Sequence, residues 1–492
     1  MMTVSLRWVC FFLVLLSGPR GQVAAALPVL PTLCPAELPP AIAAIINRPV
    51  FQRSRWGILV QTLDANRPQA RQTLYAREAE RYFIPASTTK LLTTAAVLTA
   101  LGSQFRFRTS VYGVETARGW QLRLVGRGDP SFTTGQLRQL VQQLQQQGVR
   151  HVAQLTADDT YYQGDLFNPR WAWSDLQAGY GAPANSLILD ENLLELKLTP
   201  QKVGQPLVVE WADPNAAKDW QIVNATVTVA ANQPEAIAAE RSLNQPIATV
   251  KGQLRGGGEP DGATIAIADP AQHFLNQLQQ LLAAANIPVD RATIGHQAVL
   301  LPTAELAVVE SAPLMELIKT MNHDSNNIYA ESLLRSLGKM LPASPNQTTL
   351  DLGLTQLQTT LTQLGIDPAS FALTDGSGLS RHNLVSPVAL VQTLQVMAPQ
   401  AGFRASLPVA GQSGTLEYRF RGTPAVGIVQ AKTGTLSGAV ALSGYINPAH
   451  YPPLVFSLIL NHEITSKALS RAAIDEIVVL LARLRSCGPQ SS

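Results

Sequence analysis

Ser87-Thr88-Thr89-Lys90 forms an S-x-x-K motif that places a hydroxyl and an amine three positions apart. On a helix, residues at this spacing share one face, so the Lys90 amine comes within hydrogen-bond reach of the Ser87 hydroxyl. Serine becomes a good nucleophile when a base takes its proton, and lysine is such a base when its pKa is lowered. The motif alone is weak evidence, because a second copy at Ser336 to Lys339 is interpreted as a solvated helix face.

Two further motifs strengthen this interpretation. Ser325-Asn326-Asn327 is an S-x-N motif, a pattern that also occurs at two other places, and Lys432-Thr433-Gly434 is a K-T-G motif that occurs once. From Ser87 to Ser325 is 325 − 87 = 238 positions. Together the motifs supply a nucleophile, two amines and an amide, which is a set suited to acyl transfer.

The three motifs, in this order, resemble those of the penicillin-recognising serine enzymes. The closer resemblance is to the D-alanyl-D-alanine carboxypeptidases and endopeptidases of the penicillin-binding protein 4 type, the low-molecular-mass class C group. It runs from about residue 40 to the C-terminus and also rests on longer runs. These runs are Ile84–Lys90, Gly126–Pro130, Tyr180–Pro183, Met321–Asn327, Asp375–Asn383 and Leu407–Gly411.

The resemblance implies a role for each motif residue. Ser87 attacks the D-Ala-D-Ala carbonyl and forms an acyl-enzyme, and Lys90 accepts its proton. Lys432 supplies positive potential that keeps Lys90 neutral. Ser325 relays a proton to the departing D-Ala amine, and Asn327 holds Lys90 and a substrate amide. The residues do not themselves fix the base, because the base is disputed in analogous enzymes.

The K-T-G strand is expected to bind the substrate. The resemblance implies that the hydroxyls of Thr433 and Thr435 bind the terminal carboxylate, with Gly434 between them. The backbone N–H groups of Ser87 and Thr435 would form the oxyanion hole. Ordinary strand positions are the alternative for the two threonines, and loop capping is the alternative for Ser325 and Asn327.

A segment rich in aromatic residues, residues 171–180, indicates a side-chain pocket. By resemblance, Asp175 approaches the free amino end of a diaminopimelate side chain, while Trp173 and Tyr180 pack on its aliphatic part. The alternative is an aromatic patch that joins two domains. Arg381 either lines the pocket or pairs with Asp375, and we favour a structural loop there.

The predicted fold is α+β, with a transpeptidase/β-lactamase-like core of antiparallel sheet and helices. The long first gap fits an inserted domain, as the resembling family has. The predicted boundaries are a catalytic domain at 27–107 and 272–492, an inserted domain at 108–189 and 255–271, and a nested β-rich domain at 190–254. Strands are expected at 56–63 and 71–76, and helices from Ser87 onward, over 137–144, 271–284 and 466–484.

Composition and charge exclude several classes of protein. The 492 residues are 46% hydrophobic and 14% charged, which is unlike a disordered chain. The length predicts about three domains. The formal net charge is only +3, so nothing indicates nucleic-acid binding.

The first 26 residues predict an export signal. Arg7 precedes the apolar run Trp8 to Leu16, and Ala24 to Ala26 offer a cleavage site. The run is too short to span a bilayer, which needs about 20 residues. We therefore expect an exported protein, in the periplasm, with no integral membrane segment after signal removal.

Cys34 and Cys487 then remain, near opposite ends of the chain. In an oxidising compartment they are predicted to form a disulfide, with two free thiols as the alternative. The seven His residues are scattered without a ligand-like spacing, so no metal or other cofactor is expected.

The predicted function is that of an exported serine DD-peptidase. Its partners would be peptidoglycan stem peptides and β-lactam antibiotics, which would bind covalently to Ser87. One alternative is a β-lactamase-like esterase or hydrolase on the same core, and another is an inactive peptidoglycan-binding protein. The balance of carboxypeptidase and endopeptidase activity, and the choice between monomer and homodimer, stay open.

Overall fold

The strands Ala439–Ile446 (β17) and Leu454–Asn461 (β18) are buried at every position, as expected of strands in the middle of a sheet covered on both faces. In this computed structural model, which describes residues 32–63, 70–295 and 304–487, they are the second and third strands of a five-stranded antiparallel sheet. The order is β16-β17-β18-β1-β2, with β16 (Val429–Leu436), β1 (Arg55–Thr62) and β2 (Thr73–Arg77). The predicted signal segment lies outside the described residues.

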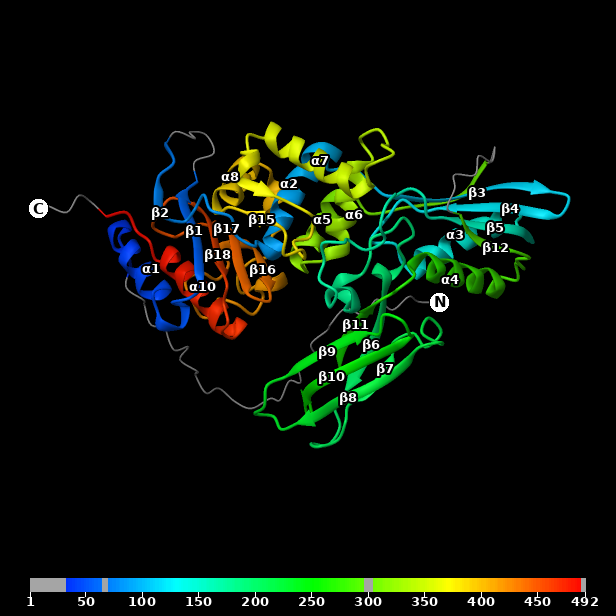
Figure 1. Cartoon of the computed structure of the whole chain (residues 1–492), viewed down its shortest axis with the longest axis horizontal. Coiled ribbons are helices and arrows are strands. Elements are labelled where there is room, and N and C mark those ends of the chain that lie inside the picture. Colours follow the sequence, from blue (N-terminus) through cyan, green and yellow to red (C-terminus); the bar gives the residue numbers. More distant parts are fainter. Residues whose placement is uncertain (1–31, 64–69, 296–303, 488–492) are drawn as a thin grey trace, which may run out of the picture. The chain divides into compact units, whose positions relative to one another are not determined.

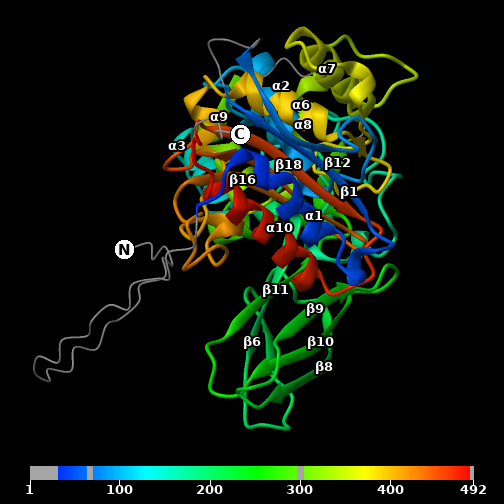
Figure 2. The same ribbon diagram turned by 90° about the vertical axis from the view of Figure 1, so that its left-hand side faces the viewer.

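Helices pack on both faces of this first sheet (Figures 1 and 2). On one face, α1 (Leu38–Ile46) and α10 (Lys467–Ala482) share an apolar cluster with β1, β17 and β18. On the other face, α2 (Thr89–Leu101) and α8 (Pro387–Met397) share a larger cluster with residues of the same strands. Helix α2 is buried almost all round, because further helices pack on its outer side. These helices are α5 (Leu314–His323), α6 (Asn327–Gly338), α7 (Thr349–Gln363) and α9 (Ala401–Ala405).

A second five-stranded sheet follows α2 in the chain. Its order is β12-β5-β4-β3-β13, and the strands are β3 (Arg108–Thr116), β4 (Gly119–Val125), β5 (Val152–Asp158), β12 (Ala292–Gly295) and β13 (Ala304–Glu310). Helices α3 (Thr134–Gln146) and α4 (Pro270–Ala284) pack on it. Both contribute to its apolar core, α3 through the predicted face of Leu137, Leu140, Val141 and Leu144.

The catalytic domain was predicted to resume at residue 272, but the residues that follow still belong to this second sheet and its core. Helix α4, β12 and β13 all belong to the second core, and β13 pairs with β3. The physical reason is that β3 and β5 each need a partner strand along their open edges, and the chain supplies both after the nested segment. The inserted part therefore extends to Glu310.

Two three-stranded sheets lie within the insertion. One has the order β11-β6-β7, with β6 (Leu193–Thr199), β7 (Val208–Trp211) and β11 (Asp261–Ala266); the other has the order β8-β10-β9, with β8 (Gln221–Val229), β9 (Ala236–Arg241) and β10 (Ile247–Arg255). The nested region thus contains the predicted β-rich residues, but it does not end at residue 254. Strand β11 pairs with β6, and the glycines at 256–258 only form the turn before it. The assignment of 255–271 to the outer inserted domain was therefore wrong for β11.

The two ends of the described chain meet. Cys34 and Cys487 form a disulfide with a Cα–Cα distance of 5.8 Å, next to a bridge between Leu33 and Leu484. This link holds the segment before α1 to the segment after α10.

The remaining elements are short. They are β14 (Phe371–Ala372) and β15 (Leu384–Val385), and the 3-10 helices η1 (Pro35–Glu37), η2 (Pro49–Phe51), η4 (Ala86–Thr88), η5 (Asp175–Gln177), η6 (Gly179–Gly181), η7 (Asp190–Asn192), η8 (Pro368–Ser370) and η9 (Gly414–Leu416). None of the helices in the described ranges combines the length and the apolar character that crossing a membrane requires.

Candidate active site

Ser87 lies in η4, in the sharp turn that precedes α2. Ala86 before it has φ 49°, and Gly378 packs so closely that an added Cβ would lie 1.9 Å from the Ala86 carbonyl oxygen. The turn therefore needs glycine at position 378. Ser87 opens into a cavity of about 280 Å³. The lining comprises Ser87, Asp175, Tyr180, Ser325, Asn327, Gly378, Leu379, Arg381, Thr435, Leu436, Ser437 and Lys467.

Lys90 sits beneath Ser87 and is fully buried. Its Nζ donates to Ser87 Oγ at 3.0 Å, to Asn327 Oδ1 at 2.7 Å and to the Ser377 carbonyl oxygen at 2.7 Å. The predicted proximity of Ser87, Lys90 and Asn327 is therefore present in the structure.

The environment of Lys90 suits a base. Burial lowers the pKa of Lys90 to about 7, while the charges of Asp375 and Glu331 oppose the shift. The main cause is desolvation, and not the charge of Lys432 that the sequence analysis invoked. A neutral amine has two hydrogens, which Asn327 and the Ser377 carbonyl accept, so its lone pair is left for the Ser87 hydroxyl.

Ser325 and Lys432 form the second half of the site. Ser325 lies in the turn between α5 and α6 with φ 58°, and Lys432 Nζ donates to its Oγ at 2.9 Å. Lys432 is fully buried in β16, and burial together with the charge of Lys90 holds its pKa well below the ordinary value. The hydroxyl of Ser325 accepts from Lys432 and so keeps its own proton for another acceptor.

Strand β16 passes directly beside the Ser87 turn. A Cβ on Gly434 would lie 2.7 Å from the Pro85 carbonyl oxygen, so only glycine allows this approach. Thr435 lines the cavity, whereas Thr433 bonds to Thr415 Oγ1 at 2.8 Å.

The predicted side-chain pocket is only partly formed as expected. Asp175 is buried and accepts from Tyr180 Oη at 3.1 Å and from Arg381 Nη1 at 3.3 Å. Burial and the charge of Asp175 raise the pKa of Tyr180 to about 12. Arg381 thus lines the cavity and does not pair with Asp375. The Tyr180 carbonyl accepts from Asn327 Nδ2 at 2.8 Å, which ties this segment to the S-x-N motif.

Trp173, which was predicted to pack on the aliphatic part of a bound side chain, lies outside the lining of this cavity. Its side chain is 69% exposed. The residue that anchors the segment is Trp171, which is buried and donates from Nε1 to Asp375 Oδ2 at 2.9 Å.

Two buried carboxylates that the sequence analysis did not assign to the site hold the loop under Lys90. Glu331 Oε1 accepts from the backbone N–H groups of Gly376 and Ser377, at 3.0 Å each. Asp375 accepts from Gly378 N at 2.8 Å and from Ser380 N at 2.6 Å. The one sequence signal for Glu331 is its place four residues after Asn327, on the same face of α6.

The described residues contain no group of three or more His, Cys, Asp or Glu side chains placed to hold a metal ion.

Known proteins with the same chemistry are similar to this chain. Residues 38–484 match the D-Ala-D-Ala carboxypeptidase 3 (S13) family. The chain belongs to this family. The resemblance inferred from the three motifs is confirmed.

Individual relatives of this S13 member agree. It is 34% identical over 469 residues to a D-alanyl-D-alanine carboxypeptidase of Actinomadura sp. (strain R39), covering 91% of this chain and 84% of that protein. It is 27% identical over 428 residues to the D-alanyl-D-alanine carboxypeptidase DacB of Haemophilus influenzae, covering 83% of this chain and 85% of that protein. The crystal structure of penicillin binding protein 4 from Haemophilus influenzae superposes with a TM-score of 0.73 at 25% identity, covering 89% of this chain and 98% of that chain. The predicted α+β fold class is confirmed.

Proposed function

We propose that Ser87 is the nucleophile of a serine DD-peptidase that acts on peptidoglycan stem peptides through an acyl-enzyme. As an S13 member, the chain is a D-Ala-D-Ala carboxypeptidase. The observation that carries the assignment of Ser87 is the buried Lys90 amine 3.0 Å from its hydroxyl, at the wall of an open cavity.

In the acylation step, Lys90 takes the Ser87 proton while Oγ attacks the carbonyl carbon of the penultimate D-Ala. The oxyanion that develops would lie between the backbone N–H groups of Ser87 and Thr435. The close approach of Gly434 to Pro85 supports this, because it brings the two backbone segments together.

The departing amine needs a proton, and Ser325 would deliver it. Its Oγ accepts from Lys432, so its hydroxyl proton points to the substrate side, and Lys432 re-supplies the proton afterwards. Water then attacks the carbonyl carbon of the ester and gives a proton to Ser325, which passes one to Lys432. As the ester bond breaks, Lys90 returns its proton to Ser87 Oγ and the shortened peptide leaves as the acid. Through acylation, Lys90 gains one proton and Lys432 loses one, so the total charge of the two lysines does not change.

We propose that Asp175 recognises the amino end of a diaminopimelate side chain. It is the carboxylate at the cavity wall, and Tyr180 lies beside it. Arg381 on its other oxygen adds a positive charge for a carboxylate next to that amine. Trp173 takes no part in this proposal.

The finer activities also belong to the proposal. Cleavage of D-Ala-diaminopimelate cross-links is supported by fold similarity to a peptidoglycan endopeptidase of Bdellovibrio bacteriovorus (TM-score 0.52, 16% identity). Covalent β-lactam binding is supported by the complex of the Haemophilus influenzae protein with a β-lactam (TM-score 0.68). Export to the periplasm is supported by the residue 1–26 pattern and by the Cys34–Cys487 disulfide.

A β-lactamase-like hydrolase is the second candidate, and the site disfavours it. That activity needs a carboxylate that activates a deacylating water at the acyl group. Glu331 is fully buried, is committed to two backbone N–H groups and does not line the cavity.

Incubation with purified muropeptides, followed by mass analysis, tests the proposal. We expect loss of one D-Ala from pentapeptides and conversion of cross-linked dimers to monomers. A protein that changes neither substrate but turns over penicillin rapidly would support the hydrolase instead. A protein that changes neither muropeptide and does not turn over penicillin would support the inactive peptidoglycan-binding role instead.

A further inference from the structure

A cation from α10 reaches the cavity through Thr435. Arg471, in the second turn of α10, donates from Nη2 to Thr435 Oγ1 across 3.4 Å. The distance is at the long end for a hydrogen bond. The two residues are brought together by α10, which packs against β17 next to β16.

This contact fixes the role of the Thr435 hydroxyl. A hydroxyl has one hydrogen and two lone pairs, and a guanidinium can donate but never accept. Because Arg471 donates to a lone pair, the Thr435 proton must go to another acceptor. Thr435 lines the cavity beside Ser87, so a substrate group bound in that cavity can accept this proton.

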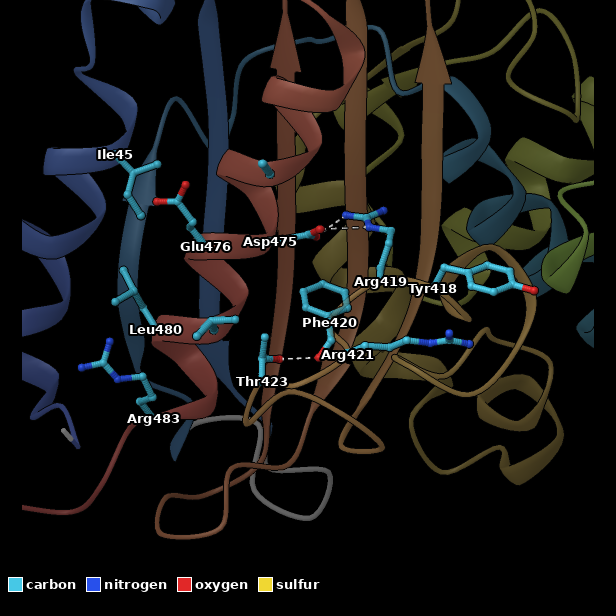
Figure 3. A pocket seen from close by; sticks show the side chains of 12 residues that line it. Ile45, Tyr418, Arg419, Phe420, Arg421, Thr423, Asp475, Glu476, Leu480 and Arg483 are labelled. Carbon is cyan, nitrogen blue, oxygen red and sulfur yellow. Dashed lines mark hydrogen bonds and ion pairs between the residues drawn. The ribbon is translucent and has the colours of Figure 1, made fainter. Parts of the chain in front are cut away.

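The carboxylate of Asp475, on the same helix, attracts Arg471 but is shared with a second cation. Asp475 lies one turn further along α10, and Arg419 binds both of its oxygens, through Nε and Nη2 (Figure 3). Lys467, one turn before Arg471, lines the same cavity. The Thr435 end of the cavity therefore lies next to two cations of α10.

We propose that Arg471 is a positioning residue for substrate carboxylate recognition. It holds Thr435 as a hydrogen-bond donor and places a positive charge behind it, where the carboxylate of the departing C-terminal residue binds. This inference rests on the proposed function and deepens it. A contact that only fastened α10 to β16 would affect folding, but it would not distinguish a charged from a neutral leaving group.

The test uses two N-acetyl-D-alanyl thioesters that differ in one group of the leaving thiol. One releases mercaptoacetate, which carries a carboxylate, and the other releases mercaptoacetamide, which is neutral and of similar size. For Arg471→Met we expect kcat/KM to fall about 10-fold or more on the first and less than about 2-fold on the second, as for the loss of a charge-assisted interaction. Arg471→Lys, which keeps a cation and a donor, should recover most of the loss.

Arg421→Met serves as the matched control, because Arg421 lies on the surface loop drawn in Figure 3 and binds Glu417. It should leave both rates unchanged. Equal losses on the two thioesters in Arg471→Met, or no loss on the charged one, would overturn the inference, as would failure of Arg471→Lys to recover activity in a variant that melts like the unmodified protein. An unmodified enzyme that cleaves neither thioester and releases no D-Ala would instead refute the proposed function, and the role of Arg471 with it.

Discussion

If Lys90 is the general base, the rate of acylation must change with pH as the Lys90 amine titrates. Only the neutral amine accepts the Ser87 proton, so activity is present above the pKa of Lys90 and is lost as the pH falls through it. Burial places that pKa at about 7, compared with 10.5 for an exposed lysine.

The expected size of the effect follows directly. With a pKa of about 7, the neutral fraction of Lys90 is about 3% at pH 5.5 and about 97% at pH 8.5, which predicts a rise in kcat/KM of about 30-fold. The assay is the initial rate of D-Ala release from a D-Ala-D-Ala peptide well below KM, between pH 5.5 and 9.5. A rate that keeps rising tenfold per unit beyond pH 8.5 would refute the reasoning, because it would mean that burial does not lower this pKa.

A charge-removing variant sharpens the test. The negative charge of Glu331 opposes the lowered pKa of Lys90, so Glu331→Gln should move the acidic limb of the profile to lower pH, by about one unit. The glutamine carbonyl can still accept from Gly376 and Ser377. Glu417→Gln, at an exposed ion pair with Arg421, is the matched control and should not shift the limb.

Three other predictions concern recognition, geometry and stability. Asp175→Asn should lower kcat/KM about 10-fold for peptides with free diaminopimelate and spare a diacetyl-lysine peptide; equal effects would count against the pocket. Gly434→Ala should reduce D-Ala release by about 100-fold with little change in melting temperature, because its methyl group pushes β16 away from Pro85; normal activity would show that the approach is not needed. Replacing Cys34 and Cys487 by serine should cost about 2–5 kcal/mol of stability, seen as a lower melting temperature, with the rate constant for acylation at 25 °C retained; an unchanged melting temperature would contradict this.

The residues of the three motifs could be predicted because each motif is local and its chemistry depends on residue type. The spacing of Ser87 and Lys90 already sets them on one face, and the order of the motifs separates them from their chance copies. The helix α2 and the strand β16, which carry two of the motifs, follow from the same local patterns.

The parts that the sequence did not reveal depend on contacts between distant segments. Nothing local to Arg471 indicates Thr435, and nothing near Glu331 indicates the loop at Gly376. The domain boundary failed for the same reason, since β13 pairs with β3 only after the whole nested region has intervened. Trp171 and Trp173 are two positions apart, and the sequence does not tell which of them is buried. In the structure Trp171 is buried and bonds to the distant Asp375, whereas Trp173 is exposed.

Acylation of Ser87 itself is the most direct test of the account. The protein is incubated with benzylpenicillin, digested, and the adduct is located by peptide mass. We predict a single adduct, attached to the side chain of Ser87. We predict that this adduct is absent from the Lys90→Ala variant. An adduct on Ser325 or another residue, or normal labelling of Lys90→Ala, would contradict the central claim that Lys90 activates Ser87.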